Sequence, residues 1–99
     1  MDLLLEGKKV IITGATKGIG LASAKELVRE GADVAICSRT SEDVDRVIKD
    51  LSTFGTKVIG SAVDLYDMEA YLKWLEEASR DLGGCDIFVS NVTGGTAMA

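Results

Sequence analysis

The sequence predicts an α/β fold in which four parallel strands form a sheet with helices on its faces. Short apolar runs rich in β-branched residues alternate with segments whose apolar residues recur at helical spacing. Glycines stand where these helical segments are expected to end, and the connections to the next strand are short. Right-handed crossovers in such an alternating chain give the strand order 3-2-1-4.

Each expected strand is a short apolar run. The first, residues 8–13, reads Lys-Lys-Val-Ile-Ile-Thr, and its consecutive apolar residues are typical of a strand covered on both faces. The other three are residues 33–38, 57–63 and 86–90. The fourth strand lies at an edge of the predicted sheet and is apolar, so we expect a further strand or a partner to cover it, or self-association through it.

The first two expected helices begin and end at residues suited to those positions. The first covers residues 18–30 and ends before Gly31. The second begins at Thr40, which together with Asp43 matches the S/T-x-x-D/E capping pattern, and it ends at Gly55. Its apolar stripe consists of Val44, Val47, Ile48 and Leu51.

The third expected helix follows Asp67, a suitable N-cap residue, and ends at Gly83 and Gly84. Its apolar stripe consists of Met68, Tyr71, Leu72, Leu75 and Leu82. We interpret the aromatic residues Tyr66, Tyr71 and Trp74 as packing residues.

Length, charge and composition narrow the classes of function. Ninety-nine residues suffice for one domain with a single core. A net charge of -5 argues against nucleic-acid and anionic-membrane partners, which need clustered Lys and Arg. No apolar run reaches the ~18 residues of a membrane span, and the N-terminus lacks a signal-peptide pattern, so we expect a cytoplasmic protein.

The absence of histidine excludes His-based catalysis and His metal ligands, and we expect no metal site. Cys37 and Cys85 are interpreted as buried thiols.

Residues 13–20 join the first strand to the first helix and contain three glycines, Gly14, Gly18 and Gly20. The first N–H groups of a helix have no partner inside the helix, and the helix dipole makes this end positive. Glycine allows positive φ angles and lets a phosphate approach the backbone. The segment therefore predicts a phosphate-binding turn. It is not a P-loop, because Ile19 stands where the G-x-x-x-x-G-K-S/T spacing requires glycine.

The spacing Thr13-Gly14-x-x-x-Gly18-x-Gly20 resembles the cofactor motif of the short-chain dehydrogenase/reductase family. Residues 63–65 (Val-Asp-Leu) are similar to the family's adenine-binding motif of an aspartate followed by a hydrophobic residue. Residues 86–91 (Asp-Ile-Phe-Val-Ser-Asn) are similar to the strand that leads into its N-N-A-G motif, and residues 5–10 to its usual lead-in. The resemblance covers essentially the whole chain and implies a Rossmann-type dinucleotide-binding domain over residues 1–99, partial relative to the family.

The resemblance implies that a dinucleotide contacts several of these segments. Asp64 would accept a hydrogen bond from the adenine amino group, and Leu65 would support the ring. The expected cofactor-binding residues are Thr13, Gly14, Thr16, Lys17, Gly18, Ile19, Gly20, Ser38, Arg39, Thr40, Asp64, Leu65 and Asn91.

The end of the second expected strand predicts NADP(H) as the cofactor. Sites for NAD usually place a carboxylate there, which binds the ribose 2′-OH. This chain has Ser38, Arg39 and Thr40 instead, which can donate hydrogen bonds to a 2′-phosphate, and Lys17 lies in the glycine turn. Charge-assisted bonds from Arg and Lys to phosphate are among the stronger polar contacts.

No residue of this chain is assigned a catalytic role. The resemblance implies a proton relay that uses a tyrosine and a lysine four residues after it. In this chain, the residue four positions after Tyr66 is Ala70, and the one four positions after Tyr71 is Leu75. Residues 90–94 (Ser-Asn-Val-Thr-Gly) depart from N-N-A-G in a way that resembles 3-oxoacyl-carrier-protein reductases and related carbonyl reductases.

Two interpretations of the function follow. In the first, the chain is the NADP(H)-binding part of a short-chain oxidoreductase that acts on a carbonyl/alcohol pair, and it is inactive alone. In the second, it is a stand-alone, non-catalytic nucleotide-binding or interaction module. The family resemblance also implies a homo-oligomer.

Overall fold

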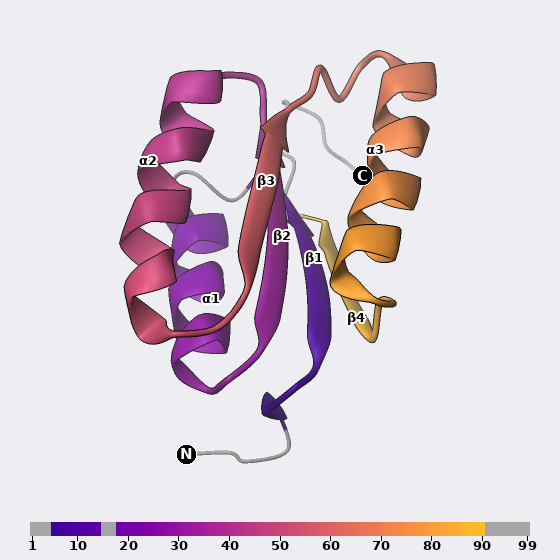
Figure 1. Ribbon diagram of the computed structural model, residues 1–99. Helices are drawn as coiled ribbons and strands as arrows, with labels where there is room; N and C mark the ends of the chain where they lie inside the picture. Colours follow the sequence, from indigo (N-terminus) through magenta and orange to yellow (C-terminus); the bar gives the residue numbers. More distant parts are fainter. Residues whose placement is uncertain (1–4, 15–17, 91–99) are drawn as a thin grey trace.

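The computed structural model describes residues 5–14 and 18–90. The elements follow in the order β1 (Lys9–Thr13), α1 (Gly18–Arg29), β2 (Asp33–Ser38), α2 (Ser41–Leu51), the 3-10 helix η2 (Ser52–Phe54), β3 (Val58–Ala62), α3 (Met68–Leu82) and β4 (Ile87–Ser90). The strands form one parallel sheet in the order β3-β2-β1-β4. Helices α1 and α2 lie on one face of the sheet and α3 on the other (Figure 1). The predicted fold class and strand order are confirmed.

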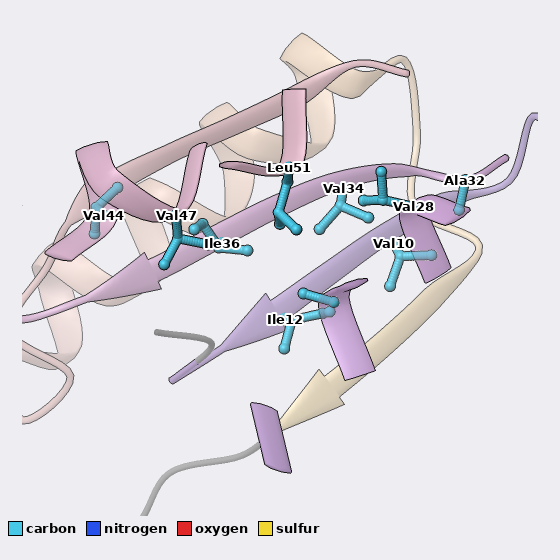
Figure 2. Packing of buried hydrophobic residues seen from close by; sticks show 10 residues of the cluster. Val10, Ile12, Val28, Ala32, Val34, Ile36, Val44, Val47 and Leu51 are labelled. Atoms are coloured by element: carbon cyan, nitrogen blue, oxygen red, sulfur yellow. The ribbon is translucent and has the colours of Figure 1, made fainter. Parts of the chain in front are cut away.

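The larger hydrophobic core lies between the sheet and helices α1 and α2 (Figure 2). It consists of Val10, Ile12, Ala24, Val28, Ala32, Val34, Ile36, Val44, Val47 and Leu51, all of them buried. Gly60 lets α2 approach the edge strand β3, because a Cβ at this position would lie 2.8 Å from Cγ1 of Ile36 and 3.0 Å from Cγ1 of Val44. Each fully buried Val, Ile or Leu stabilises the fold by about 1.5–3 kcal/mol, so this core fixes the strands whose ends carry the predicted site.

The second core lies beneath α3. It consists of Ile11, Ala35, Cys37, Val63, Trp74, Ala78 and Leu82. The packing role predicted for Trp74 is confirmed, but that predicted for Tyr66, Met68 and Leu72 is wrong, because these side chains are exposed. Helix α3 packs on β1, β2 and β3, and the residues that it buries are Trp74, Ala78 and Leu82. Neither α3 nor any other helix in the described part of the chain is long and apolar enough to cross a membrane.

The edge position predicted for the fourth strand is confirmed. Strand β4 pairs only with β1 within the described sheet. Phe88 of this strand lies opposite Ile11 in the register, and its side chain is 48% exposed. An apolar side chain on an unpaired edge favours association with another strand.

The caps of α2 and α3 differ from each other. The N-cap predicted for α3 is confirmed, because the backbone N–H of Ala70 donates to Oδ1 of Asp67 at 3.2 Å. Thr40 is the N-cap residue of α2, but its side chain makes no capping hydrogen bond. The predicted helix start at Thr40 is therefore confirmed, without the hydrogen bond of a capping box. The Asp43 carboxylate instead binds Arg46 one turn further along, at 2.9 Å.

The two cysteines lie in different environments. Cys37 is buried in the sheet beneath α3, as predicted. Cys85 is exposed, so its predicted burial is wrong. It lies in the connection between α3 and β4, where its Sγ donates to the carbonyl oxygen of Ile87 at 3.4 Å before the chain enters the sheet.

Charged side chains connect the amino ends of the strands. Asp33, at the start of the inner strand β2, accepts a bond from Nζ of Lys9 at 2.7 Å and another from the backbone N–H of Lys57 at 2.9 Å. The backbone N–H of Lys9 donates to Asp86 at 2.8 Å. The hydrogen bond from Lys9 is the main cause that lowers the pKa of Asp33 below its ordinary value of 3.8. These contacts join four neighbouring segments at the amino edge of the sheet.

Candidate functional site

The predicted site residues that the structure describes lie at or just after the carboxyl edge of the sheet. Because all four strands are parallel, their carboxyl ends lie along the same edge. Two backbone hydrogen bonds continue the ladder past the strand ends: Gly14 N donates to the carbonyl oxygen of Cys37 at 2.9 Å, and Val63 N donates to that of Ser38 at 2.7 Å. The chain therefore leaves β1, β2 and β3 at adjacent points, which bring Gly14, Ser38 and Asp64 to one edge.

The glycine turn connects β1 to α1. Gly14 and Gly18 have φ angles of 70° and 57°, in the left-handed region that glycine adopts without strain. A Cβ at Gly18 would meet none of the described residues within 4 Å. Thr16 and Lys17 lie outside the described residues.

The amino end of α1 is suited to an anion. Helices α2 and α3 carry acidic residues in their first turns, whereas α1 carries none. The first turn of α1 therefore has no carboxylate that would offset the partial positive charge at this end of the helix. Gly20 is buried, while the Ile19 side chain is 78% exposed beside the turn. The start of α1 thus offers backbone donors and an uncovered apolar side chain.

The second segment of the site is the connection between β2 and α2. Ser38 ends β2 and is half-buried, whereas Arg39 and Thr40 are exposed. Thr40 precedes the first turn of α2, and its hydroxyl makes no cap bond there. The end of β2 carries hydroxyl and guanidinium donors and no carboxylate.

The third segment follows β3. Asp64 is exposed, and its Oδ1 accepts a hydrogen bond from the backbone N–H of Tyr66 at 3.0 Å. The backbone N–H of Asp67 donates to the Asp64 carbonyl, also at 3.0 Å, which completes a tight turn. Leu65 is half-buried and packs against the core beneath α3. Asn91, after β4, lies outside the described residues.

Tyr71, on α3, lies on the other side of the sheet from the glycine turn's helix (Figure 1). Its side chain is half-buried and packs against the core that contains Cys37, so the packing role predicted for it is confirmed. Burial raises the pKa of Tyr71 above its ordinary value.

Cys37 lies beneath α3 and is not a reactive group. Its side chain is fully buried, and desolvation raises the pKa of its thiol to about 11. Thiolate chemistry needs the opposite shift. Cys37 therefore acts as a small apolar residue beneath the strand ends.

The family model for short chain dehydrogenases matches residues 8–99. The chain belongs to the short-chain dehydrogenase/reductase family. Among its relatives, it is 45% identical over 92 residues to the uncharacterized oxidoreductase YvrD of Bacillus subtilis (strain 168). The match covers 93% of this chain and 34% of that protein. This short-chain dehydrogenase sequence therefore spans about a third of the length of that relative.

Solved structures of the family agree with the fold described above. A metagenomic short-chain oxidoreductase in complex with NADP superposes with a TM-score of 0.85 at 31% identity, covering 92% of this chain and 41% of that chain. The NADH-dependent reductase A1-R′ complexed with NAD gives a TM-score of 0.84 at 29% identity, covering 95% and 39%. Similar folds in the family thus hold either form of the nicotinamide dinucleotide.

Proposed function

We propose that residues 1–99 form the NADP(H)-binding part of a short-chain oxidoreductase that acts on a carbonyl/alcohol pair. The observation that carries this proposal is the alignment of Gly14, Ser38 and Asp64 along the carboxyl edge of one parallel sheet. An extended dinucleotide fits such an edge, because its phosphates and its adenosine need donors and acceptors at separate points. Family membership and the two dinucleotide-bound neighbours support the same proposal.

The glycine turn would hold the pyrophosphate. The positive φ angles of Gly14 and Gly18 direct the chain into α1, whose first N–H groups lack intrahelical partners. The first turn of α1 has no carboxylate to repel the phosphates, and a Cβ added at Gly18 would meet none of the described residues within 4 Å. The residues present therefore fit a diphosphate.

The choice of NADP(H) depends on the end of β2. Ser38, Arg39 and Thr40 would donate to the 2′-phosphate, whereas an NAD site usually has a carboxylate at this point. The exposed guanidinium of Arg39 can reach a ligand at the edge without leaving a buried position. Asp43 is nearby on α2, but its carboxylate is bound to Arg46, which lowers its repulsion of a phosphate.

The adenine would lie against the loop after β3. One oxygen of the Asp64 carboxylate binds Tyr66 N–H and fixes the side chain, and the other is suited to accept from the adenine amino group. Leu65 is anchored in the core beneath α3, so its role would be to hold this loop in place.

The chemistry would need residues beyond this chain. A bound nicotinamide dinucleotide supplies or accepts hydride. The residues described here bind and orient that cofactor, but neither tyrosine of the chain is followed by lysine four residues later. We therefore expect no dehydrogenase turnover from these 99 residues alone.

The proposal is tested by titrating NADPH and NADH separately into the protein and following the fluorescence. We expect NADPH to bind more tightly, and Arg39→Ala to weaken NADPH by about tenfold to hundredfold while NADH is unchanged, since one charge-assisted contact is lost. Arg29→Ala is the matched control, because Arg29 is an exposed arginine in the last turn of α1, close in the chain to the amino end of β2 and not to its carboxyl end. Equal affinity for both cofactors, or equal losses in the two variants, would refute the assignment of the 2′-phosphate site.

A further inference from the structure

The first turns of α1 and α2 carry different charges, although both helices follow the carboxyl ends of strands. The first turn of α1 has no acidic residue, whereas that of α2 has Glu42 and Asp43. Both helices begin with N–H groups that lack intrahelical partners and with partial positive charge. The two carboxylates therefore make the start of α2 a different environment for an anion from the start of α1.

Only one of the two carboxylates is offset by a cation. Oδ1 of Asp43 lies 2.9 Å from Nη1 of Arg46, one turn further along α2, and the Asp43 side chain is only 21% exposed. Glu42 is exposed, and it makes no ion pair within the described part of the chain. The Asp43–Arg46 pair is close to neutral, so the charge that remains in the first turn of α2 is that of Glu42.

Glu42 lies next to the segment that we assign to the 2′-phosphate. Thr40 is the N-cap residue of α2, with an extended backbone, and its side chain makes no cap hydrogen bond. Glu42 follows two residues after Thr40 and three after Arg39, and all three are exposed. A phosphate monoester carries a charge of about −1.5 to −2 at pH 7. A 2′-phosphate held by Arg39 and Thr40 would therefore be repelled by Glu42, whereas the uncharged 2′-OH of NADH would not.

We propose that Glu42 is a specificity-determining residue that lowers the affinity for NADPH relative to NADH. This inference rests on the proposed function, because it needs a 2′-phosphate at the end of β2. The Glu42 carboxylate has two opposite effects: it stabilises the positive end of α2, and it repels a phosphate bound beside that end. Arg39 attracts the 2′-phosphate, and Glu42 limits the preference for NADPH that results.

The test is the ratio of NADPH to NADH affinity in Glu42→Gln, measured by fluorescence titration at low ionic strength. We expect NADPH to bind about threefold more tightly, which is typical of one exposed charge at a helix end, while NADH is unchanged. Glu42→Lys changes the charge by two and should tighten NADPH about tenfold or more. At 1 M salt the gain in Glu42→Gln should disappear, because the Debye length falls to about 3 Å.

Glu69→Gln is the matched control. Glu69 is exposed and has the same position in α3 as Glu42 has in α2, two residues after the N-cap residue Asp67. Both variants should lose similar stability in urea unfolding, since each removes a carboxylate from a positive helix end. The ratio of NADPH to NADH affinity should be unchanged in Glu69→Gln. An unchanged ratio in Glu42→Gln, or the same change in both variants, would overturn the inference.

Arg39→Ala separates a failure of this inference from a failure of the proposed function. If the parent protein prefers NADPH and Arg39→Ala removes that preference, the 2′-phosphate site stands, and an unchanged ratio in Glu42→Gln then refutes the role of Glu42 alone. If the parent shows no preference for NADPH, or Arg39→Ala leaves the preference intact, the 2′-phosphate site is refuted and the role of Glu42 with it.

Discussion

The amino and carboxyl ends of the strands use polar residues in opposite ways. At the amino ends, the Asp33 carboxylate binds the Lys9 ammonium and the backbone N–H of Lys57, so it is engaged within the protein. At the carboxyl ends, Arg39 and Asp64 are exposed, and a Cβ added at Gly18 would meet none of the described residues within 4 Å. The amino ends of the strands therefore stabilise the sheet, whereas the carboxyl ends keep their donors and acceptors accessible. Substitutions at the two ends should therefore separate stability from ligand binding.

The largest effect is expected at the glycine turn. Gly18→Val places a β-branched side chain at a φ of 57°, beside the turn to which we assign the pyrophosphate in our proposal. We expect NADPH affinity to fall about hundredfold or more, because several backbone contacts to phosphate are blocked together. Calorimetric titration measures this loss.

Gly55→Val controls for the backbone strain. Gly55 has a φ of 86° and also has nothing within 4 Å of an added Cβ, but it ends η2. Both variants should lose comparable stability, on the order of 1–2 kcal/mol, because a non-glycine residue is forced into the left-handed region. Retained NADPH affinity in Gly18→Val would show that the turn does not hold the diphosphate.

A smaller effect, on stability alone, is expected at the amino edge. Asp33→Asn removes the ion pair with Lys9 while an acceptor oxygen remains for Lys57 N–H. We expect the free energy of unfolding to fall by about 1 kcal/mol, since the pair is partly shielded from solvent. Urea unfolding measures it, and the exposed Asp45→Asn serves as control. Cofactor affinity should be the same in both variants; a binding loss in Asp33→Asn would contradict the separation of the two ends.

The smallest effect is the pH dependence of that stability. The pKa of Asp33 is lowered in the folded protein from its ordinary value of 3.8, chiefly by the hydrogen bond from Lys9. The ionised carboxylate therefore stabilises the fold above about pH 4, and this stabilisation is lost as the pH falls through the lowered pKa. Urea unfolding between pH 6 and pH 2 should show a shallower acid loss in Asp33→Asn than in the parent protein. Parallel curves would mean that Asp33 titrates alike in the folded and unfolded chains.

Local signals in the sequence were sufficient for the fold and for where the described site residues lie in it. Apolar periodicity located the strands, and glycines marked turns because positive φ is a property of single residues. The placement of Gly14, Ser38 and Asp64 at one edge followed from parallel strand order alone. Thr16, Lys17 and Asn91 remain predictions that lie outside the described residues.

Features that depend on tertiary contacts were not predictable. The exposure of Met68 and Leu72 depends on how α3 is rotated over the sheet, which the helical period does not specify. The Asp33 contacts span 24 residues to each partner, so no local pattern indicates them.

The pairing of β1 with β4 has a consequence for the order in which the protein can fold during synthesis. The backbone N–H of Lys9 binds Asp86, 77 residues later in the chain. At about 5–20 residues added per second, roughly 4–15 s separate the synthesis of the two partners. Throughout that interval β1 has one side without its final neighbour, and its apolar strand is open to pairing with other nascent chains. This delay makes an inner strand of the finished sheet a temporary edge until β4 is synthesised and pairs with it.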